Sequence, residues 1–107
     1  MRFDIVLAPQ AIAGLRKLRP DLRSRVRDAI ELHLRHEPTK TSRSRIKRLR
    51  GLERPQYRLR VDEVRVFYDV TEDTVQVLSV VTKGQAEAWL AQEGIPATAR
   101  RPGEDEG

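Results

Sequence analysis

The sequence of 107 residues contains no cysteine. Disulfide bonds, thiolate metal sites and a cysteine nucleophile are therefore excluded. No apolar run reaches the roughly 18 residues that a membrane-spanning helix needs. A glycine-rich phosphate-binding loop and the HExxH motif of zinc peptidases are missing as well. With 38% apolar and 35% charged residues, the composition is typical of one small soluble domain with a lean core.

The hydroxyl and imidazole side chains form no recognisable catalytic pattern. Ser42, Ser44 and Ser79 have no neighbouring base in the sequence, so a serine hydrolase triad is not predicted. His33 and His36 are spaced to share one side of a helix, but no cysteine or carboxylate cluster accompanies them. We therefore expect neither a metal site nor a cofactor.

Acidic residues are scarce in one segment of the chain. Residues 40–60 contain a single acid, Glu53. The basic residues of this segment are Lys40, Arg43, Arg45, Lys47, Arg48, Arg50, Arg54, Arg58 and Arg60. Its formal charge is +8, whereas the rest of the chain sums to −3. Together with a pI near 10.2, this concentration favours an anionic partner, either nucleic acid or an acidic protein.

The N-terminal half predicts one strand and two helices. Residues 2–8 are mostly of the β type. Pro9 and Pro20 each suit the first turn of a helix, where the missing N–H would be unpaired anyway. Apolar residues follow at helical spacing, namely Ala11, Ile12, Leu15 and Leu18 in the first helix and Leu22, Val26, Ala29 and Ile30 in the second. Gly14 should weaken the first helix, and Pro38 ends the second.

The second half predicts a loop, three strands and a helix. Residues 39–45 are polar and indicate a mobile loop, after which Ile46 returns the chain to the core. The strand-like runs are residues 56–61, 64–70 and 74–81, and the last is apolar enough to be buried on both faces. Residues 83–92 predict a final helix, with Gly94 just beyond its end. Nothing apolar recurs after Pro96, so we expect residues 95–107 to be a disordered tail.

The predicted order of elements is β-α-α-β-β-β-α. It indicates an α+β fold in which two N-terminal helices pack on one face of a small, mainly antiparallel four-stranded sheet, within a domain spanning residues 1–94. The first strand should join the sheet late, because its neighbours in sequence are helices. Asp4 interrupts any signal-peptide core, so we expect a cytoplasmic protein.

The pair Asp62-Glu63 predicts a two-residue turn between two alternating strands. In that register Arg58 lies opposite Phe67 and Arg60 lies opposite Arg65, all on the side away from the core. Like charges directly opposite each other destabilise a strand pair by about 0.2–1 kcal/mol unless something anionic lies between them. Arginine donates bidentately to phosphate, and Phe67 beside the arginines offers a stacking surface for a base.

Two alternatives to this arginine-rich face remain open. Alternating charge on a strand is often only the solvated face of a half-covered sheet. A one-residue slip in register would exchange the two faces of the hairpin.

Tyr57 and Tyr68 face each other and are expected at the core or its edge. Trp89 either anchors the last helix or stacks on a base.

These residues resemble a known family. The runs Lys47-Arg48-Leu49-Arg50-Gly51, Tyr57-Arg58-Leu59-Arg60-Val61 and Val64-Arg65-Val66-Phe67-Tyr68-Asp69-Val70 are similar to the pattern of the RelE/ParE superfamily of toxin–antitoxin toxins. The resemblance covers about residues 3–92. Asp62-Glu63-Val64 stands where the family often has Gly-Asp-Tyr, which changes the type of turn but not the register.

The resemblance implies a small bacterial toxin that a cognate antitoxin neutralises. Its RelE branch implies an endoribonuclease that cuts mRNA in the ribosomal A site without a metal. There the RNA 2′-OH attacks the adjacent phosphate, giving a cyclic phosphate and a free 5′-OH. Its ParE branch has a similar fold but poisons DNA gyrase through protein–protein contact and has no nuclease role.

By position, the resemblance also assigns roles. Arg58 and Arg60 stand where RelE-type enzymes often have lysines, one of them a proposed general base, and Arg65 stands on the phosphate-binding arginine. Lys83 lies near an arginine proposed to protonate or stabilise the leaving oxygen, and Trp89 lies near a terminal tyrosine that stacks on a base. Arginine is a poor base, so Arg58 and Arg60 should stabilise charge rather than accept a proton.

The leading hypothesis is therefore a RelE-like, ribosome-dependent mRNA endonuclease. Its expected catalytic residues are Arg58, Arg60, Arg65 and Lys83, and its expected RNA-binding residues are Lys47, Arg48, Arg50, Phe67 and Trp89. The missing lysine base and terminal tyrosine favour the second hypothesis, a ParE-like gyrase poison. A third is an inactive module whose basic groove mainly holds an acidic or amphipathic antitoxin segment.

Overall fold

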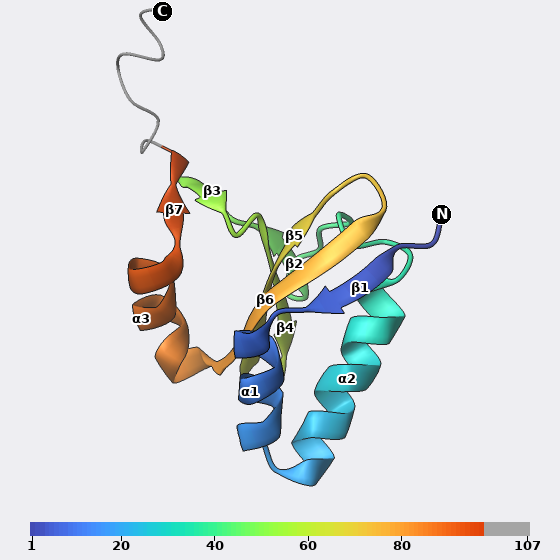
Figure 1. The fold of residues 1–107 in the computed structure, drawn as a ribbon, viewed down its shortest axis with the longest axis vertical. Helices are drawn as coiled ribbons and strands as arrows, with labels where there is room; N and C mark the ends of the chain where they lie inside the picture. Colours follow the sequence, from blue (N-terminus) through green and yellow to red (C-terminus); the bar gives the residue numbers. More distant parts are fainter. Residues whose placement is uncertain (98–107) are drawn as a thin grey trace, which may run out of the picture.

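The computed structural model describes residues 1–97 (Figure 1). The elements are β1 (Asp4–Leu7), α1 (Pro9–Lys17), α2 (Pro20–Leu34), β2 (Ile46–Arg48), β3 (Leu52–Arg54), β4 (Tyr57–Val61), β5 (Val64–Val70), β6 (Thr74–Thr82), α3 (Lys83–Glu93) and β7 (Ile95–Pro96). The residues of β7 were predicted to belong to the tail, and residues 98–107 of that tail lie outside the described residues. In the described part, no helix has the length and apolar character to cross a membrane.

The helices α1 and α2 begin at the predicted prolines. Pro9 and Pro20 each occupy the start of their helix, where no intrahelical N–H is needed. Their buried faces consist of Ala11 and Leu15 in α1 and of Leu22, Val26, Ile30 and Leu34 in α2. Arg23 ties the end of α1 to α2, because its guanidinium donates to the carbonyl oxygens of Leu15 and Leu18 at 3.0 and 2.9 Å.

The main sheet has five strands in the order β1-β6-β5-β4-β2. The prediction of four strands was wrong, because β2 is only three residues long and Ile46 is its one apolar residue. A further two-stranded sheet joins β3 and β7. β1 pairs in parallel with β6, the last strand of the hairpin series, so the expectation of a late-joining first strand is confirmed. The other pairs in the main sheet are antiparallel.

The hairpin of β4 and β5 has the predicted register. Arg58 lies opposite Phe67, and Arg60 lies opposite Arg65. Asp62 in the turn adopts a left-handed φ of 52°, a conformation that aspartate tolerates better than most residues. The alternate residues of the two strands face α1 and α2, and four of them are fully buried: Leu59, Val64, Val66 and Tyr68. The core therefore lies between this side of the sheet and the two N-terminal helices.

The helix α3 contacts the opposite side of the sheet (Figure 1). A capping box between Thr82 and Gln85 starts the helix. None of its residues is buried, and its Trp89 ring stacks on Phe67 of β5 with ring centroids 5.1 Å apart. Because Phe67 alternates with the core residues of β5, this contact places α3 on the face opposite α1 and α2.

Candidate functional site

Basic residues of β2, β4 and β5 share the face of the sheet that points away from the core, and Arg45 lies at its border, directly before β2. Arg58 and Arg60 come from β4 and Arg65 from β5, as the register requires. On the other side of β4, Lys47 of β2 lies opposite Arg58. Arg45 continues the row of Arg60, whose backbone nitrogen donates to the Arg45 carbonyl oxygen at 2.8 Å. We call Arg45, Lys47, Arg58, Arg60 and Arg65 the cationic face.

The charges of the cationic face are not neutralised by the ion pairs found within residues 1–97. Two of the acids near them in the sequence are paired with other arginines: Asp62 with Arg25 at 2.7 Å, and Asp69 with Arg54 at 2.8 Å. Glu63 in the hairpin turn is exposed and pairs with none of the five basic residues. Within the described residues, Arg58, Arg60 and Arg65 share one face of the hairpin and take part in no ion pair. An anion bound there would gain charge-assisted hydrogen bonds without competing with a carboxylate.

The electrostatics show that the arginines influence one another. The pKa of Arg58 is lowered first by burial and then by the charges of Arg65 and Arg60. The pKa of Arg65 is lowered by burial and by the charge of Arg60. In addition, the Nε atom of Arg58 is buried and has no hydrogen-bond partner among the described residues. An unsatisfied buried donor is costly, and a bound phosphate oxygen would satisfy it.

Arg65 and Lys83 lie at the turn of the hairpin. The Nη1 atom of Arg65 donates to the carbonyl oxygens of Asp62 and Val64 at 2.9 and 3.1 Å, which orients the guanidinium. The backbone nitrogen of Lys83 donates to the carbonyl oxygen of Glu63 at 2.7 Å, so the exposed Lys83 begins α3 beside the same turn. Arg65 and Lys83 thus lie at the turn, with Arg60 opposite Arg65, whereas Arg58 lies nearer the middle of the sheet, opposite Phe67. The roles of these residues stay predictions.

The predicted RNA-binding residues on the β2 segment are divided between locations. Lys47 belongs to the cationic face. Arg48 lies opposite Tyr57 on the other face, with its Cζ atom 5.2 Å from the centre of that ring. Arg50 is exposed in the bend before Gly51, which has a positive φ of 75°. Only Lys47 of these three therefore extends the row of arginines.

The paired tyrosines behave as predicted for core residues. The Tyr57 and Tyr68 rings stack with their centroids 5.5 Å apart. The Tyr68 hydroxyl donates to the carbonyl oxygen of Pro38 at 2.6 Å. Burial, followed by the neighbouring Tyr57, raises the pKa of Tyr68 well above its ordinary value. Tyr68 is therefore a neutral structural residue that fixes the loop after α2.

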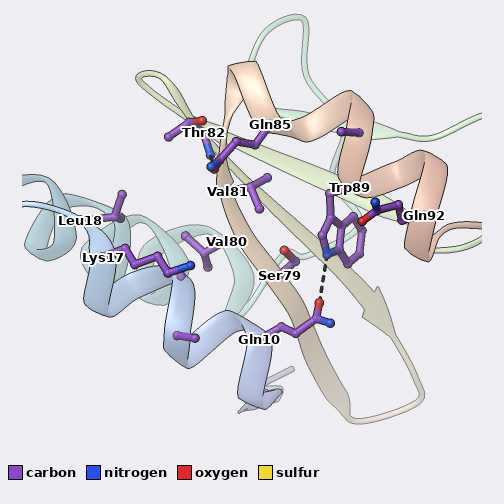
Figure 2. A pocket seen from close by; sticks show the side chains of 13 residues that line it. Gln10, Lys17, Leu18, Ser79, Val80, Val81, Thr82, Gln85, Trp89 and Gln92 are labelled. Carbon is purple, nitrogen blue, oxygen red and sulfur yellow. Dashed lines mark hydrogen bonds between the residues drawn. The ribbon is translucent and has the colours of Figure 1, made fainter.

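The aromatic residues Phe67 and Trp89 contact each other. Phe67 is only 1% exposed, and the rings of Phe67 and Trp89 are nearly parallel, at 5°. The accessible stacking surface expected at Phe67 is thus absent from this structure, because α3 covers it. The Trp89 indole nitrogen donates to Oε1 of Gln10 on α1 at 3.0 Å (Figure 2). These contacts agree with the interpretation of Trp89 as the anchor of α3.

A cavity of about 560 Å³ lies between α1, the end of β6 and α3. Figure 2 shows Gln10 and Trp89 pointing toward each other across it, with Ser79 and Val81 on the β6 wall. Trp89 is the only predicted site residue among its lining residues. The cavity is therefore separate from the cationic face.

The two histidines do not build a metal site in the described part of the chain, where no group of three or more potential ligands occurs. Burial and the charge of Arg45 lower the pKa of His33. Arg45 itself was missed as a site residue. Because Ile46 is buried, its neighbours in an extended segment should point away from the core, and this would have identified Arg45. The inference requires that residues 46–48 are first recognised as a strand.

Comparison with known proteins supplies the family. The family described as "ParE toxin of type II toxin-antitoxin system, parDE" matches residues 5–87. No curated protein matches the chain.

Solved structures share the fold at low sequence identity. A RelB–RelE antitoxin–toxin complex from Methanococcus jannaschii is 20% identical with a TM-score of 0.63, covering 78% of this chain and 96% of that one. The RelBE2 toxin–antitoxin complex from Mycobacterium tuberculosis is 23% identical with a TM-score of 0.59, covering 77% and 99%. The YoeB dimer from Staphylococcus aureus is 16% identical with a TM-score of 0.55, covering 74% and 94%. With the family match over most of the chain, the protein belongs to the RelE/ParE superfamily and is a toxin of a type II toxin–antitoxin system.

Proposed function

We propose that this toxin is a ribosome-dependent mRNA endonuclease of the RelE type. The observation that carries the proposal is the cationic face, where Arg58, Arg60 and Arg65 converge without a carboxylate partner among residues 1–97. The buried, unpaired Nε of Arg58 adds a donor that a phosphate oxygen would satisfy. The fold is that of solved RelE structures, which is compatible with this function, although the ParE branch shares it.

In this mechanism the arginines bind the scissile phosphate and stabilise its transition state. The RNA 2′-oxygen forms a bond to phosphorus, the bond to the 5′-oxygen breaks, and a cyclic phosphate results. Negative charge grows on the phosphoryl oxygens during the attack, and preorganised guanidinium donors stabilise that charge more than they stabilise the ground state. The catalytic contribution of these residues is therefore electrostatic.

Proton transfer requires other groups, because arginine does not give up its proton in proteins. Among the basic residues predicted for the site, only Lys47 and Lys83 have side chains of a type that can give up a proton. Lys47 lies opposite Arg58 on the cationic face, and Lys83 lies beside the hairpin turn. We assign them as candidates for accepting the 2′-OH proton and for protonating the leaving 5′-oxygen.

A translation extract tests the proposal. The purified toxin should cut mRNA at codons in the ribosomal A site, and Arg65→Ala should lower cutting by at least about a hundredfold, because one oxyanion-stabilising donor contributes about 10²–10³ in rate. Arg27→Ala, which removes an exposed arginine of α2 that lines a cavity with Ile5 and Leu7 of β1, is the control and should cut normally. Intact transcripts at concentrations that stop growth would contradict the nuclease.

A gyrase poison is the second candidate. The matching family is that of ParE toxins, and arginines occupy the positions where RelE-type enzymes often have lysines. A supercoiling assay separates the candidates. Inhibited gyrase together with uncut mRNA would select this function, and cut mRNA with unaffected gyrase would select the nuclease.

A cognate antitoxin is the proposed regulatory partner in either case. The similar structures from Methanococcus jannaschii and Mycobacterium tuberculosis are toxin–antitoxin complexes. The unneutralised cationic face would attract an acidic segment of such a partner. Harmless expression of the isolated chain in cells would instead favour an inactive module that only binds its antitoxin.

A further inference from the structure

Arg45 joins two cavities at the border of the cationic face. A cavity of about 240 Å³ opens between the end of α2 and the following loop, and its polar lining includes His33, Lys40, Ser42 and Arg45. A second, of about 290 Å³, is lined by Ser44, Arg45, Arg60 and Asp62. Because Arg45 lines both, positive charge continues from the hairpin into the loop before β2.

The backbone around Arg45 is held in place by hydrogen bonds. The backbone nitrogens of Arg45 and Ile46 donate to Oγ of Ser42 at 3.0 and 3.2 Å. The Arg45 carbonyl oxygen accepts the Arg60 backbone nitrogen, and Ile46 is buried in the core. The Arg45 side chain therefore starts from a fixed point next to Arg60, and a ligand need not order the loop first.

The acids near Arg45 are paired with other residues. Glu37 lies 3.6 Å from Lys40, and Asp62 lies 2.7 Å from Arg25. Arg45 takes part in none of the ion pairs found in the described range 1–97. Burial and then the charge of Arg45 lower the pKa of His33. Arg45 is thus a cation without an ion-pair partner in the described range, although Glu37 and Asp62 line its two cavities.

We propose that Arg45 forms a second phosphate subsite, which binds a phosphodiester of the same RNA strand next to the one held by Arg58, Arg60 and Arg65. The inference rests on the proposed nuclease function and deepens it. Adjacent strands lie about 4.8 Å apart. Arg65 of β5 lies opposite Arg60 of β4, and Arg45, which directly precedes β2, is bonded through its backbone to Arg60, so the three residues follow one another across the sheet. An RNA strand crossing the sheet in that direction meets Arg45 directly after Arg60.

RNA binding as a function of salt tests the subsite. The probe is a single-stranded RNA of about ten nucleotides with 2′-O-methyl sugars throughout, which removes every attacking 2′-OH. Its binding to the full chain is measured by fluorescence anisotropy. Arg45→Ala should weaken binding by about three- to tenfold at low salt and reduce the slope of log K against log [salt] by about 0.7, the release expected for one phosphate contact on a single strand. Arg45→Lys should keep most of the slope, and Arg27→Ala should bind as the wild type does. An unchanged affinity and slope in Arg45→Ala, or no binding by the wild type, would overturn the subsite.

The His33 imidazole gives a second measurement that a merely structural role of Arg45 would not move. Apart from the histidine, the charged side chains lining its cavity are Glu37, Lys40 and Arg45. A phosphate beside Arg45 offsets that charge, so the RNA should raise the pKa of His33 in an NMR titration. In Arg45→Ala the pKa of His33 should be higher without RNA and should move less when RNA is added. His36, whose Nδ1 lies 3.3 Å from the Met1 carbonyl oxygen, is the internal reference.

The two proposals can fail separately. RNA binding that depends on Arg45, with intact transcripts in the translation extract, would remove the nuclease and keep the subsite. Cut transcripts, with RNA affinity and a His33 pKa that do not depend on Arg45, would keep the nuclease and remove the subsite.

Discussion

The two faces of the β4–β5 hairpin use alternate residues of the same two strands and have opposite physical characters. On one face Leu59, Val66 and Tyr68 are fully buried against the N-terminal helices. On the other face Arg58, Arg60 and Arg65 raise the local positive potential, and burial and mutual repulsion lower the pKa values of Arg58 and Arg65. The first face contributes to folding, whereas the second is a liability to folding that a bound anion would relieve.

The cationic side is itself divided along the strand. Phe67 is on the same side as the arginines, yet Trp89 of α3 covers it almost completely. The fold therefore covers Phe67, which lies directly opposite the half-buried Arg58, and leaves Arg60 exposed. This side of the hairpin therefore differs from an ordinary solvated sheet face. A solvated face would not combine a covered aromatic residue with a buried guanidinium nitrogen that has no hydrogen-bond partner.

The largest effect on stability is expected on the core face. Leu59→Ala removes a fully buried side chain and should lower the free energy of unfolding by about 2–5 kcal/mol, measured by urea denaturation. Leu32→Ala is the matching control, because Leu32 is 73% exposed on α2, and it should change the free energy of unfolding by less than about 0.5 kcal/mol. Equal losses in the two variants would contradict the assignment of the core to this face.

Much of the core face could be predicted from the sequence, because its signals are local. Proline at the first helical position located α1 and α2, and the two-residue turn at Asp62 determined which residues of β4 and β5 alternate to which side. The short strand β2 could not be predicted from three residues with one apolar side chain. Its pairing with β4 depends on tertiary contacts between distant segments.

The candidate site was predictable only in part, for the same reason. Arg58, Arg60 and Arg65 follow from alternation along one hairpin, so the sequence was sufficient to bring them together. The place of Lys47 beside Arg58 and of Arg45 beside Arg60 requires the missed strand. The burial of Phe67 requires knowledge of where α3 packs, and no local pattern contains that information.

A smaller effect is expected where α1 packs on the core side of the sheet. A Cβ atom at position 14 would overlap the carbonyl oxygen of Val80, so Gly14 allows helix and strand to approach closely. Gly14→Ala gains about 1 kcal/mol of helix propensity, but the overlap with backbone costs about 1–3 kcal/mol. The variant should therefore be less stable in thermal unfolding.

Gly84→Ala separates these two contributions. A Cβ atom at position 84 would meet only Oγ1 of Thr82, at 4.0 Å, so the substitution should be neutral or slightly stabilising. The two glycine-to-alanine changes should therefore shift the stability in opposite directions. The difference arises because α1 packs closely on the sheet, whereas α3 buries none of its residues. A stabilising Gly14→Ala would show that α1 is not pressed against β6.

The smallest change in stability is expected on the cationic face, and whether stability rises or falls there is informative. Arg60→Ala removes one member of the directly opposed pair with Arg65, so it should leave stability unchanged or raise it by up to about 1 kcal/mol. Inorganic triphosphate at constant ionic strength should raise the melting temperature of the wild type, because a ligand that binds only the folded state stabilises it. Triphosphate should raise the melting temperature of Arg60→Ala by less. The melting temperature of Arg27→Ala should rise as much as that of the wild type, because this variant also loses one positive charge but keeps every residue of the cationic face. Equal responses of all three proteins would mean that net charge alone attracts the anion, and the special status of this face of the hairpin would be lost.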